Sequence, residues 1–173
     1  MPADGGDRGD EAAAAVAVRP AREDELDELH ARLRAEWFGD VIVSRGVAHE
    51  LSDLSVLVAL DGASVAGLAT YIVSGGECEL VTLNAFKQSR GIGGALLEAV
   101  ADAARDAGCR RLWLTTTNDN LTAQRFYERR GLRLATIHRA AVDDARRLKP
   151  SIPLVGEHGI EIHDELEYEL LLL

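Results

Sequence analysis

Three glycines crowd the start of one predicted helix, in the stretch QSRGIGGALLEAV at residues 88–100. A glycine inside a helix costs about 1 kcal/mol relative to alanine, so Gly91, Gly93 and Gly94 need a reason. The first turn of a helix carries unpaired N–H groups and the positive end of the helix dipole, which together bind anions. Because glycine leaves those N–H groups uncovered, the cluster predicts a phosphate or pyrophosphate site. A tight strand-to-helix turn that needs small residues is the alternative.

Two common phosphate-binding patterns do not fit this stretch. The dinucleotide fingerprint G-x-G-x-x-G requires glycine or alanine where Leu96 stands. The Walker pattern G-x-x-x-x-G-K-[ST] does not occur in the chain. A nucleotide-binding regulatory domain is therefore disfavoured.

Two carboxylates could provide acid–base chemistry just before the glycines. Glu77 and Glu79 are two residues apart on a predicted strand and so share one face of it. A carboxylate whose pKa is raised by an apolar cleft can act as a general base, for about 10²- to 10⁴-fold in rate. The alternative is a pair of exposed strand glutamates. Cys78 points to the opposite face, so no thiol nucleophile is proposed.

Predicted strands and helices alternate in a way that places these residues. The strands are 15–20, two runs of a hairpin within 55–73 around Asp61-Gly62, 77–86, 110–117, 132–138 and one within 160–172. The helices are 22–38, 91–107, 118–131 and 141–150, and the stretch 41–54 has no clear pattern. Asn118 or Asn120 is the expected N-cap of the third helix. The order is a β-meander, then β-α-β-α-β, then a closing strand.

Helical spacing also predicts which side chains are buried. The expected apolar faces are Leu26, Leu29, Leu33 and Trp37 on the first helix, and Ile92, Leu96, Ala99, Ala103 and Ala107 on the second.

The charge of the chain is unevenly distributed. The 173 residues carry a net charge of -10, but residues 87–150 hold 13 Lys plus Arg against 7 Asp plus Glu. The overall acidity argues against non-specific nucleic-acid binding, so no nucleic-acid partner is expected. The basic middle could receive a compact anion or be an ordinary solvated surface.

The remaining composition bounds location and architecture. No run approaches the roughly 18 apolar residues that span a membrane, and the N-terminus lacks the apolar core of a signal peptide. We expect no membrane partner, a cytoplasmic location, and buried thiols at Cys78 and Cys109. Residues 1–13 are expected to be a disordered tail and residues 14–173 one domain. His158 and His163 are not expected to form a metal site.

Two ordered motifs carry a family resemblance. Gln88-x-x-Gly91-x-Gly93 matches the pyrophosphate loop of the GNAT superfamily of acyl-CoA-dependent N-acyltransferases. The run from Asn120 through Phe126-Tyr127 to Gly131-Leu132 resembles the second signature of that family, departing only at Leu132, where phenylalanine is commoner. The resemblance covers residues 15–172. It implies an α/β (α+β) fold whose mixed, mostly antiparallel central sheet is flanked by helices, with splayed central strands forming the acyl-CoA cleft.

The resemblance also implies which residues hold acetyl-CoA. The Gln88 side chain and the helix-start amides would bind the pyrophosphate, and backbone groups of the strand would pair with the pantetheine arm. An N–H near Leu83 would stabilise the oxyanion. Asn120 would hydrogen-bond the cofactor arm, cap the helix, or do both. The full set implied is Val81, Leu83, Gln88, Arg90, Gly91, Ile92, Gly93, Gly94, Ala95, Asn120, Ala123 and Tyr127.

Catalytic roles follow from the same resemblance. Tyr127 sits where relatives place the acid that protonates the departing thiolate, and a half-buried core tyrosine is the alternative. Glu77 sits where many relatives place a catalytic glutamate, while Glu79 is one step nearer the acetyl carbon, so the choice between them stays open. Relatives line the acceptor pocket from the stretch after the first helix, which here holds Trp37, Arg45 and His49.

The expected function is acetyl-CoA-dependent N-acetylation of a small-molecule amine by direct attack in a ternary complex, without a metal. The alternatives are acetylation of a protein or peptide amine, and a non-catalytic acyl-CoA-binding module. Acidic residues outside the loop favour a cationic acceptor, whereas Arg45 and Arg139 favour one that bears a carboxylate. That choice stays open, and the expected assembly is a monomer or homodimer.

Overall fold

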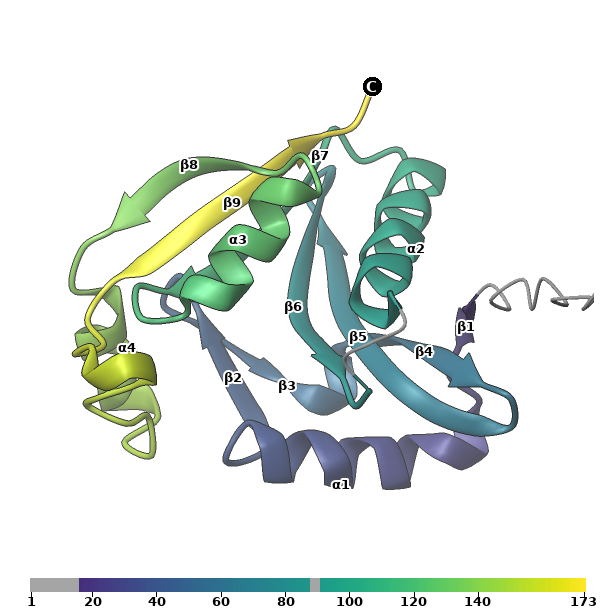
Figure 1. Ribbon diagram of the computed structural model, residues 1–173, viewed down its shortest axis with the longest axis horizontal. Helices are drawn as coiled ribbons and strands as arrows, with labels where there is room; N and C mark the ends of the chain where they lie inside the picture. The colour runs from purple at the N-terminus through teal and green to yellow at the C-terminus, as the bar shows by residue number, and fades with distance from the viewer. Residues whose placement is uncertain (1–15, 88–90) are drawn as a thin grey trace, which may run out of the picture.

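A computed structural model describes residues 16–87 and 91–173. The predicted tail at 1–13 and the predicted contacts of Gln88 and Arg90 lie outside the described residues. Seven strands form one sheet in the order β1-β4-β5-β6-β7-β9-β8 (Figure 1). These strands are β1 (Ala17–Pro20), β4 (Ser55–Asp61), β5 (Ser64–Ser74), β6 (Glu77–Ala85), β7 (Arg111–Thr117), β8 (Arg133–His138) and β9 (Glu165–Leu171).

The helices and a separate hairpin surround this sheet. The helices are α1 (Leu26–Glu36), α2 (Ile92–Asp106), α3 (Leu121–Arg129) and α4 (Ala141–Leu148), with short 3-10 turns at Glu23–Glu25, Leu51–Asp53 and Glu157–Gly159. The hairpin pairs β2 (Val41–Ser44) with β3 (Val47–Glu50). The predicted β-meander, β-α-β-α-β order and closing strand are confirmed. All neighbouring strands of the main sheet pair antiparallel except β6 and β7, which are parallel.

The stretch without a clear pattern forms the β2–β3 hairpin and one 3-10 turn. Arg45 and Gly46 make its turn with φ angles of 50° and 74°, a left-handed conformation that glycine adopts readily. Each strand has only four residues, too few for alternation to stand out from the sequence. The hairpin brings Ser44 and His49 to the sheet, where they contact Thr115 of β7 and Glu79 of β6.

Helices pack against both faces of the sheet. The predicted α1 face is confirmed, because Leu29 and Leu33 are buried and Leu26 and Trp37 pack beside them. The predicted α2 face is wrong in part, because Ala99 and Ala103 are half-buried and Ala107 is exposed. The buried α2 residues are Ile92, Gly94, Leu96, Leu97, Val100, Ala101 and Ala104. Ile92, Leu96, Val100 and Ala104 are four residues apart, and Leu97 and Val100 are three apart. These spacings place them on one side of a helix with 3.6 residues per turn, the side that faces the sheet.

One glycine of β5 sets how closely α2 approaches the sheet. A Cβ on Gly67 would lie 2.6 Å from the Asn84 carbonyl oxygen and 2.6 Å from Ile92 Cγ2. Such contacts are too short for any other residue, so Gly67 allows the first turn of α2 to pack directly against β5 and β6. The glycine-rich helix start is therefore held beside the strand that carries the two glutamates (Figure 1).

The sheet divides between β6 and β7. Their pairing is confined to Glu77–Glu79 opposite Arg111–Trp113, after which the two parallel strands separate toward their carboxyl ends (Figure 1). β7 continues its pairing with β9 on the other side, from Arg111 to Thr117. The inner edges of β6 and β7 therefore face a gap in the middle of the sheet.

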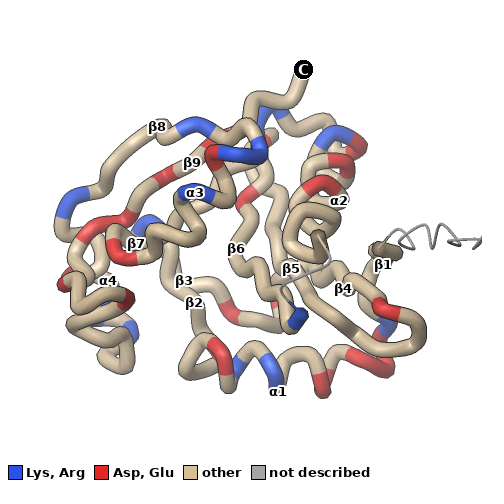
Figure 2. Tube along the Cα trace, in the orientation of Figure 1, with Lys and Arg blue, Asp and Glu red and all other residues tan. Residues whose placement is uncertain are grey.

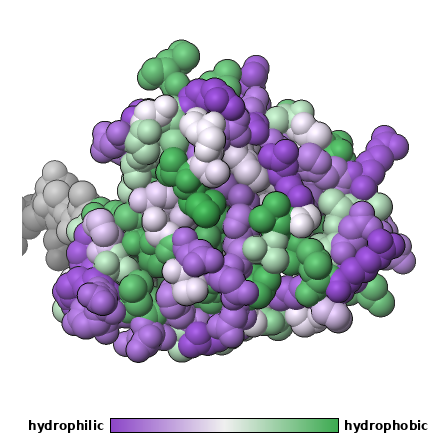
Figure 3. Space-filling model, turned by 180° about the vertical axis from the view of Figure 1, so that it is seen from behind, coloured by the Kyte–Doolittle hydropathy of each residue, from purple (hydrophilic) through white to green (hydrophobic). Residues whose placement is uncertain are grey.

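The surface is mixed in charge and in hydropathy. Asp and Glu lie along β9 and basic residues lie near the ends of β8, whereas α1 and α3 carry charges of both signs (Figure 2). Seen from behind, hydrophobic side chains reach the surface in separate places bordered by hydrophilic ones (Figure 3). In the described part of the chain, no helix is both long enough and apolar enough to cross a membrane.

Candidate active site

A cavity of about 550 Å³ occupies the gap between β6 and β7. We call it the β6–β7 cavity. Its walls are the separated strands, the end of α1, β2 and the start of α3. The residues that line it are Glu36, Trp37, Phe38, Ile42, Val43, Ser44, Leu80, Val81, Thr82, Leu83, Asn84, Leu114, Thr115, Thr116, Thr117, Asn120, Ala123, Tyr127, Glu157 and Glu165. Its size suits a ligand pocket rather than a packing defect.

A β-bulge exposes backbone groups along this cavity. Thr70 of β5 faces Thr82, and the next residue, Tyr71, faces Leu80, so Val81 is an extra residue without a partner on β5. A bulge bends its strand and redirects backbone groups locally. The predicted cofactor strand residues Val81 and Leu83 both line the cavity beside this bulge.

The first turn of α2 has the geometry of an anion site. Gly91 is the N-cap with φ 67°, and the first helical hydrogen bond is donated by the Ala95 N–H to the Gly91 carbonyl at 3.0 Å. The N–H groups of residues 92–94 therefore precede the helical hydrogen-bond ladder. No atom of the described residues lies within 4 Å of the position that a Cβ on Gly91 would take, so that part of the chain leaves this space open to a ligand. At Gly93 a Cβ would lie 3.3 Å from the Phe126 ring, so this helix turn packs against α3.

An arginine missed by the sequence reasoning lies at the same helix start. A Cβ on Gly94 would overlap the Arg130 guanidinium, which therefore rests directly on the Gly94 backbone. The guanidinium also lies over the Phe126 ring, 5.0 Å from its centroid. A cation beside the positive end of a helix dipole is electrostatically unfavourable unless an anion joins them. The only sequence signal for Arg130 is the basic pair that precedes Gly131.

The second predicted motif supplies Asn120, Ala123 and Tyr127 to the cavity wall. Asn120 is the N-cap of α3, since its Oδ1 accepts a hydrogen bond from the Ala123 N–H at 3.0 Å. Tyr127 is 9 % exposed and packs against Phe126 and Tyr168. Burial raises the pKa of Tyr127 to about 12, so its hydroxyl stays protonated at neutral pH.

A second cavity, of about 610 Å³, opens under the β2–β3 hairpin. We call it the hairpin cavity. It is lined by Ser44, Arg45, Val47, Ala48, His49, Glu50, Asp53, Ile72, Ser74, Glu77, Glu79 and Trp113. Ser44 lines both cavities, and the neighbours Glu79 and Leu80 line one each. The two cavities therefore meet where β6 and β7 begin to separate.

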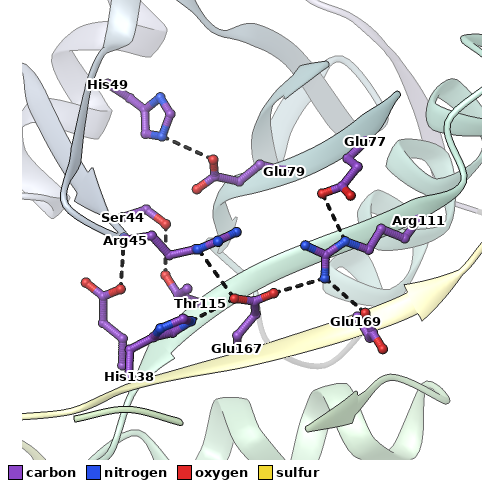
Figure 4. A network of polar contacts seen from close by, with 11 residues as sticks. Ser44, Arg45, His49, Glu77, Glu79, Arg111, Thr115, His138, Glu167 and Glu169 are labelled. Atoms are coloured by element: carbon purple, nitrogen blue, oxygen red, sulfur yellow. Dashed lines mark hydrogen bonds and ion pairs between the residues drawn. The ribbon is translucent and has the colours of Figure 1, made fainter. Parts of the chain in front are cut away.

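Glu79 is the buried carboxylate at that junction. It is 7 % exposed, and its Oε2 lies 3.1 Å from His49 Nε2 (Figure 4). The alignment of that contact falls short of a hydrogen bond, so His49 Nε2 lacks a hydrogen-bond partner in the described structure. The other carboxylate oxygen, Glu79 Oε1, is also buried without a hydrogen-bond partner among the described residues. Burial raises the pKa of Glu79, and Ser44, His49 and Arg45 offset only part of that effect. This is the environment that turns a carboxylate into a base near neutral pH.

Glu77 has a different environment, although it shares a strand face with Glu79. It forms an ion pair with Arg110 at 2.6 Å. It forms a second one with Arg111 at 2.9 Å (Figure 4). Partial burial favours its neutral form, but the two arginines outweigh that effect and lower the pKa of Glu77. We therefore do not retain Glu77 as a candidate base.

The three predicted acceptor residues separate between the two cavities. Trp37 lines the β6–β7 cavity, where its Nε1 donates a hydrogen bond to Asn84 Oδ1 at 3.1 Å. Arg45 and His49 line the hairpin cavity. Arg45 is held by Glu167, 3.5 Å from its Nε (Figure 4). Its guanidinium lies 4.7 Å from the centroid of the Trp113 ring.

Sequence reasoning missed a second buried carboxylate near the cavities. Glu165 of β9 is 4 % exposed, lines the β6–β7 cavity and accepts the Arg45 backbone N–H at 2.9 Å. Burial raises the pKa of Glu165, with the Arg45 N–H opposing it. Its contact spans 120 residues of sequence, so no local pattern could indicate it. Among the described residues no three His, Cys, Asp or Glu side chains gather as a metal site requires.

Comparisons with known proteins agree with this geometry. The acetyltransferase (GNAT) family model matches residues 13–132. Two uncharacterised Bacillus subtilis proteins are similar in sequence. YdhI is 42 % identical over an aligned region that covers 65 % of this chain and 70 % of YdhI. YxbD is 39 % identical over a region that covers 81 % of this chain and 89 % of YxbD. An acetyltransferase of the same family from Elizabethkingia anophelis, solved with acetyl-CoA bound, has a TM-score of 0.69 at 18 % identity, covering 92 % of this chain and 99 % of its own. The match over most of the chain, together with these relatives and the shared fold, shows that this protein belongs to the acetyltransferase (GNAT) family.

Proposed function

We propose that this protein is an acetyl-CoA-dependent N-acetyltransferase that acts on a small-molecule amine by direct attack in a ternary complex. The observation that carries the proposal is the separation of β6 and β7 beside the Val81 bulge, which opens a cavity between two parallel strands. Family membership and the acetyl-CoA bound to a protein of the same fold support it.

Acetyl-CoA fits the charges and spaces of this site. The open backbone at Gly91 and the N–H groups of residues 92–94, with Arg130 beside them, suit the pyrophosphate, whereas the Ala95 N–H already donates to the Gly91 carbonyl. An anion there would relieve the unfavourable placement of the Arg130 cation. The backbone of Val81 and Leu83 would pair with the pantetheine arm, and Asn120 and Ala123 would border it. Gln88 and Arg90 stay predictions from the sequence. When bound, acetyl-CoA would supply a thioester carbonyl for the amine to attack.

The chain's own groups would move the protons. The acceptor amine arrives as an ammonium and gives one proton to Glu79 at the junction of the two cavities. As the C–N bond forms and the C–S bond breaks, the sulfur takes the proton of the Tyr127 hydroxyl. The second amine proton then restores that hydroxyl through solvent. The Leu83 N–H would stabilise the developing oxyanion, an effect of about 3 kcal/mol for one such donor.

We expect acetyl-CoA to stabilise the protein and to be consumed when an amine is present. At 100 times its Kd, the free energy of unfolding should rise by about 2.7 kcal/mol, measured from the melting curve. Thiol release over a panel of amines, with mass detection of the acetylated product, identifies the acceptor. The panel includes lysine peptides and peptide N-termini, because a protein acceptor is the alternative substrate.

The possible results separate the competing functions. Stabilisation without thiol release for any amine would favour a non-catalytic binding module. No stabilisation by saturating CoA or acetyl-CoA would contradict the proposal as a whole. The cytoplasmic location and the monomeric or homodimeric state stay predictions from the sequence.

A further inference from the structure

The hairpin cavity has an acidic wall. Among the described residues that line it, Glu50, Asp53, Glu77 and Glu79 are carboxylates and Arg45 is the one arginine.

The carboxylates differ in how far they are already paired. Glu77 is neutralised by its two arginines, as described above. Glu50 and Asp53 are exposed at the rim, and no described residue forms an ion pair with either of them. Their negative charge therefore faces the opening of the cavity without a cation from the described part of the chain.

Glu79 adds an independent sign of a ligand deeper in the cavity. Its Oε1 is buried and has no described hydrogen-bond partner, although a buried carboxylate oxygen is costly to leave unpaired. An ammonium group carries three donors and a positive charge, so it would satisfy that oxygen and favour the ionised carboxylate.

The positive charges near the cavity are committed elsewhere. Arg45 lies over the Trp113 ring. It also forms an ion pair with Glu167, so its guanidinium is already engaged and less available to bind a carboxylate (Figure 4). Arg139 lines a neighbouring cavity of about 350 Å³ together with His138, and Arg45 lines both that cavity and the hairpin cavity. Arg139 itself does not line the hairpin cavity. An acceptor that bears a carboxylate would therefore meet mostly like charge in the hairpin cavity.

We infer that the hairpin cavity takes an acceptor with at least two ammonium groups, a linear diamine or polyamine. The reacting amine lies at Glu79, and a second ammonium lies at the rim between Glu50 and Asp53. This inference rests on the proposed acetyltransferase function and specifies its substrate class. It also resolves the alternative that the sequence left open, in favour of the cationic acceptor.

Three acceptors of equal length test the second charge. These are 1,6-diaminohexane, hexylamine and 6-aminohexanoate. A second series of linear diamines, from three to eight carbons, finds the preferred spacing between the two ammonium groups. Exposed ion pairs are weak, so two rim carboxylates should raise kcat/KM for the best diamine by about 5- to 30-fold over the monoamine. The preference should shrink as the salt concentration rises, because exposed charges are screened.

Variants locate the effect in the cavity. The double change Glu50→Gln with Asp53→Asn should bring the ratio of diamine to hexylamine kcat/KM close to one. Glu98→Gln removes the same kind of charge from an exposed position of α2 and should keep the ratio. Calorimetric titration of 1,6-diaminohexane into the protein saturated with CoA gives a readout independent of turnover, and the double variant should weaken that binding.

The outcomes separate this inference from the proposed function. If hexylamine is acetylated as well as every diamine, the inference is wrong and the acetyltransferase function stands. Preference for 6-aminohexanoate would overturn it in favour of recognition by Arg45. If no amine is acetylated, the proposed function fails, and calorimetry still decides whether the cavity binds a diamine. Equal binding by the wild type and the double variant would contradict the inference in that case too.

Discussion

Replacing Tyr127 by phenylalanine is expected to lower the single-turnover rate by about 10²- to 10⁴-fold, the range of general acid catalysis. Tyr127 lines the β6–β7 cavity, and its hydroxyl, with its pKa raised to about 12 by burial, keeps its proton from pH 6 to 9. The loss should therefore not vary with pH in that window. Acetyl-CoA affinity should hardly change, because the ring and its packing remain. Single-turnover measurement is needed because slow product release can hide a chemical defect.

Tyr168 offers a matched control for this change. It is a buried tyrosine whose ring lies 6.1 Å from that of Tyr127, but it does not line either cavity. Its hydroxyl donates a hydrogen bond to Glu128. Tyr168→Phe should cost about 1 kcal/mol of stability and leave the turnover rate intact. Full activity of Tyr127→Phe with an identified amine would show that Tyr127 is only a core residue.

Glu79→Gln is expected to give a loss of similar size, about 10²- to 10⁴-fold in kcat/KM, but with a strong dependence on pH. The wild-type rate should rise with pH as Glu79 loses its proton, at a pKa that burial raises above the usual carboxyl range. The rate of the Glu79→Gln variant should not show that rise with pH. The defect should be largest between the pKa of Glu79 and that of the free amine, and shrink at higher pH, where the amine is deprotonated in solution.

Stability should change in the opposite direction to activity. A carboxyl group with a raised pKa in the folded state binds its proton more tightly there than in the unfolded chain, so the wild type loses stability as the pH rises through that pKa. Glutamine has no charge to bury. The melting temperature of Glu79→Gln relative to the wild type should therefore increase with pH, even as catalysis is lost.

Glu165→Gln is the comparison that assigns the base. Glu165 is also buried with a raised pKa, but its carboxylate already accepts the Arg45 N–H. We expect a smaller loss of rate from this change, and the rate of the variant should still rise with pH as that of the wild type does. The opposite pattern, a large loss for Glu165→Gln and none for Glu79→Gln, would move the general base from β6 to β9.

Local signals explain what could be predicted of the fold. Asp61-Gly62 marks a turn between two β-rich runs, and Asn120 caps α3 through the hydrogen bond expected of its residue type. The alternation along β6 correctly separated Cys78, now buried in the core, from the face that carries Glu79. These features depend on residues within a few positions of each other.

Long-range contacts explain what the sequence could not indicate. The two glutamates look equivalent along β6, and only the tertiary position of Arg110 and Arg111 distinguishes Glu77 from Glu79. Arg130 follows α3 directly, and its side chain contacts the start of α2. The residue spacing within α3 does not predict this contact with another helix. The β2–β3 hairpin, which supplies His49 to Glu79, is defined by its contacts with the main sheet more than by its own pattern.

The central claim, that acetyl-CoA lies between β6 and β7 with its pyrophosphate at the start of α2, is tested most directly by NMR of the backbone amides. On titration with acetyl-CoA we expect the largest shifts at Val81, Leu83, Gly91 and Gly93, while Gly108, beyond the opposite end of α2, stays still. Saturating acetyl-CoA that left the β6 and α2 amides unmoved, or that shifted mainly amides elsewhere, would contradict the claim.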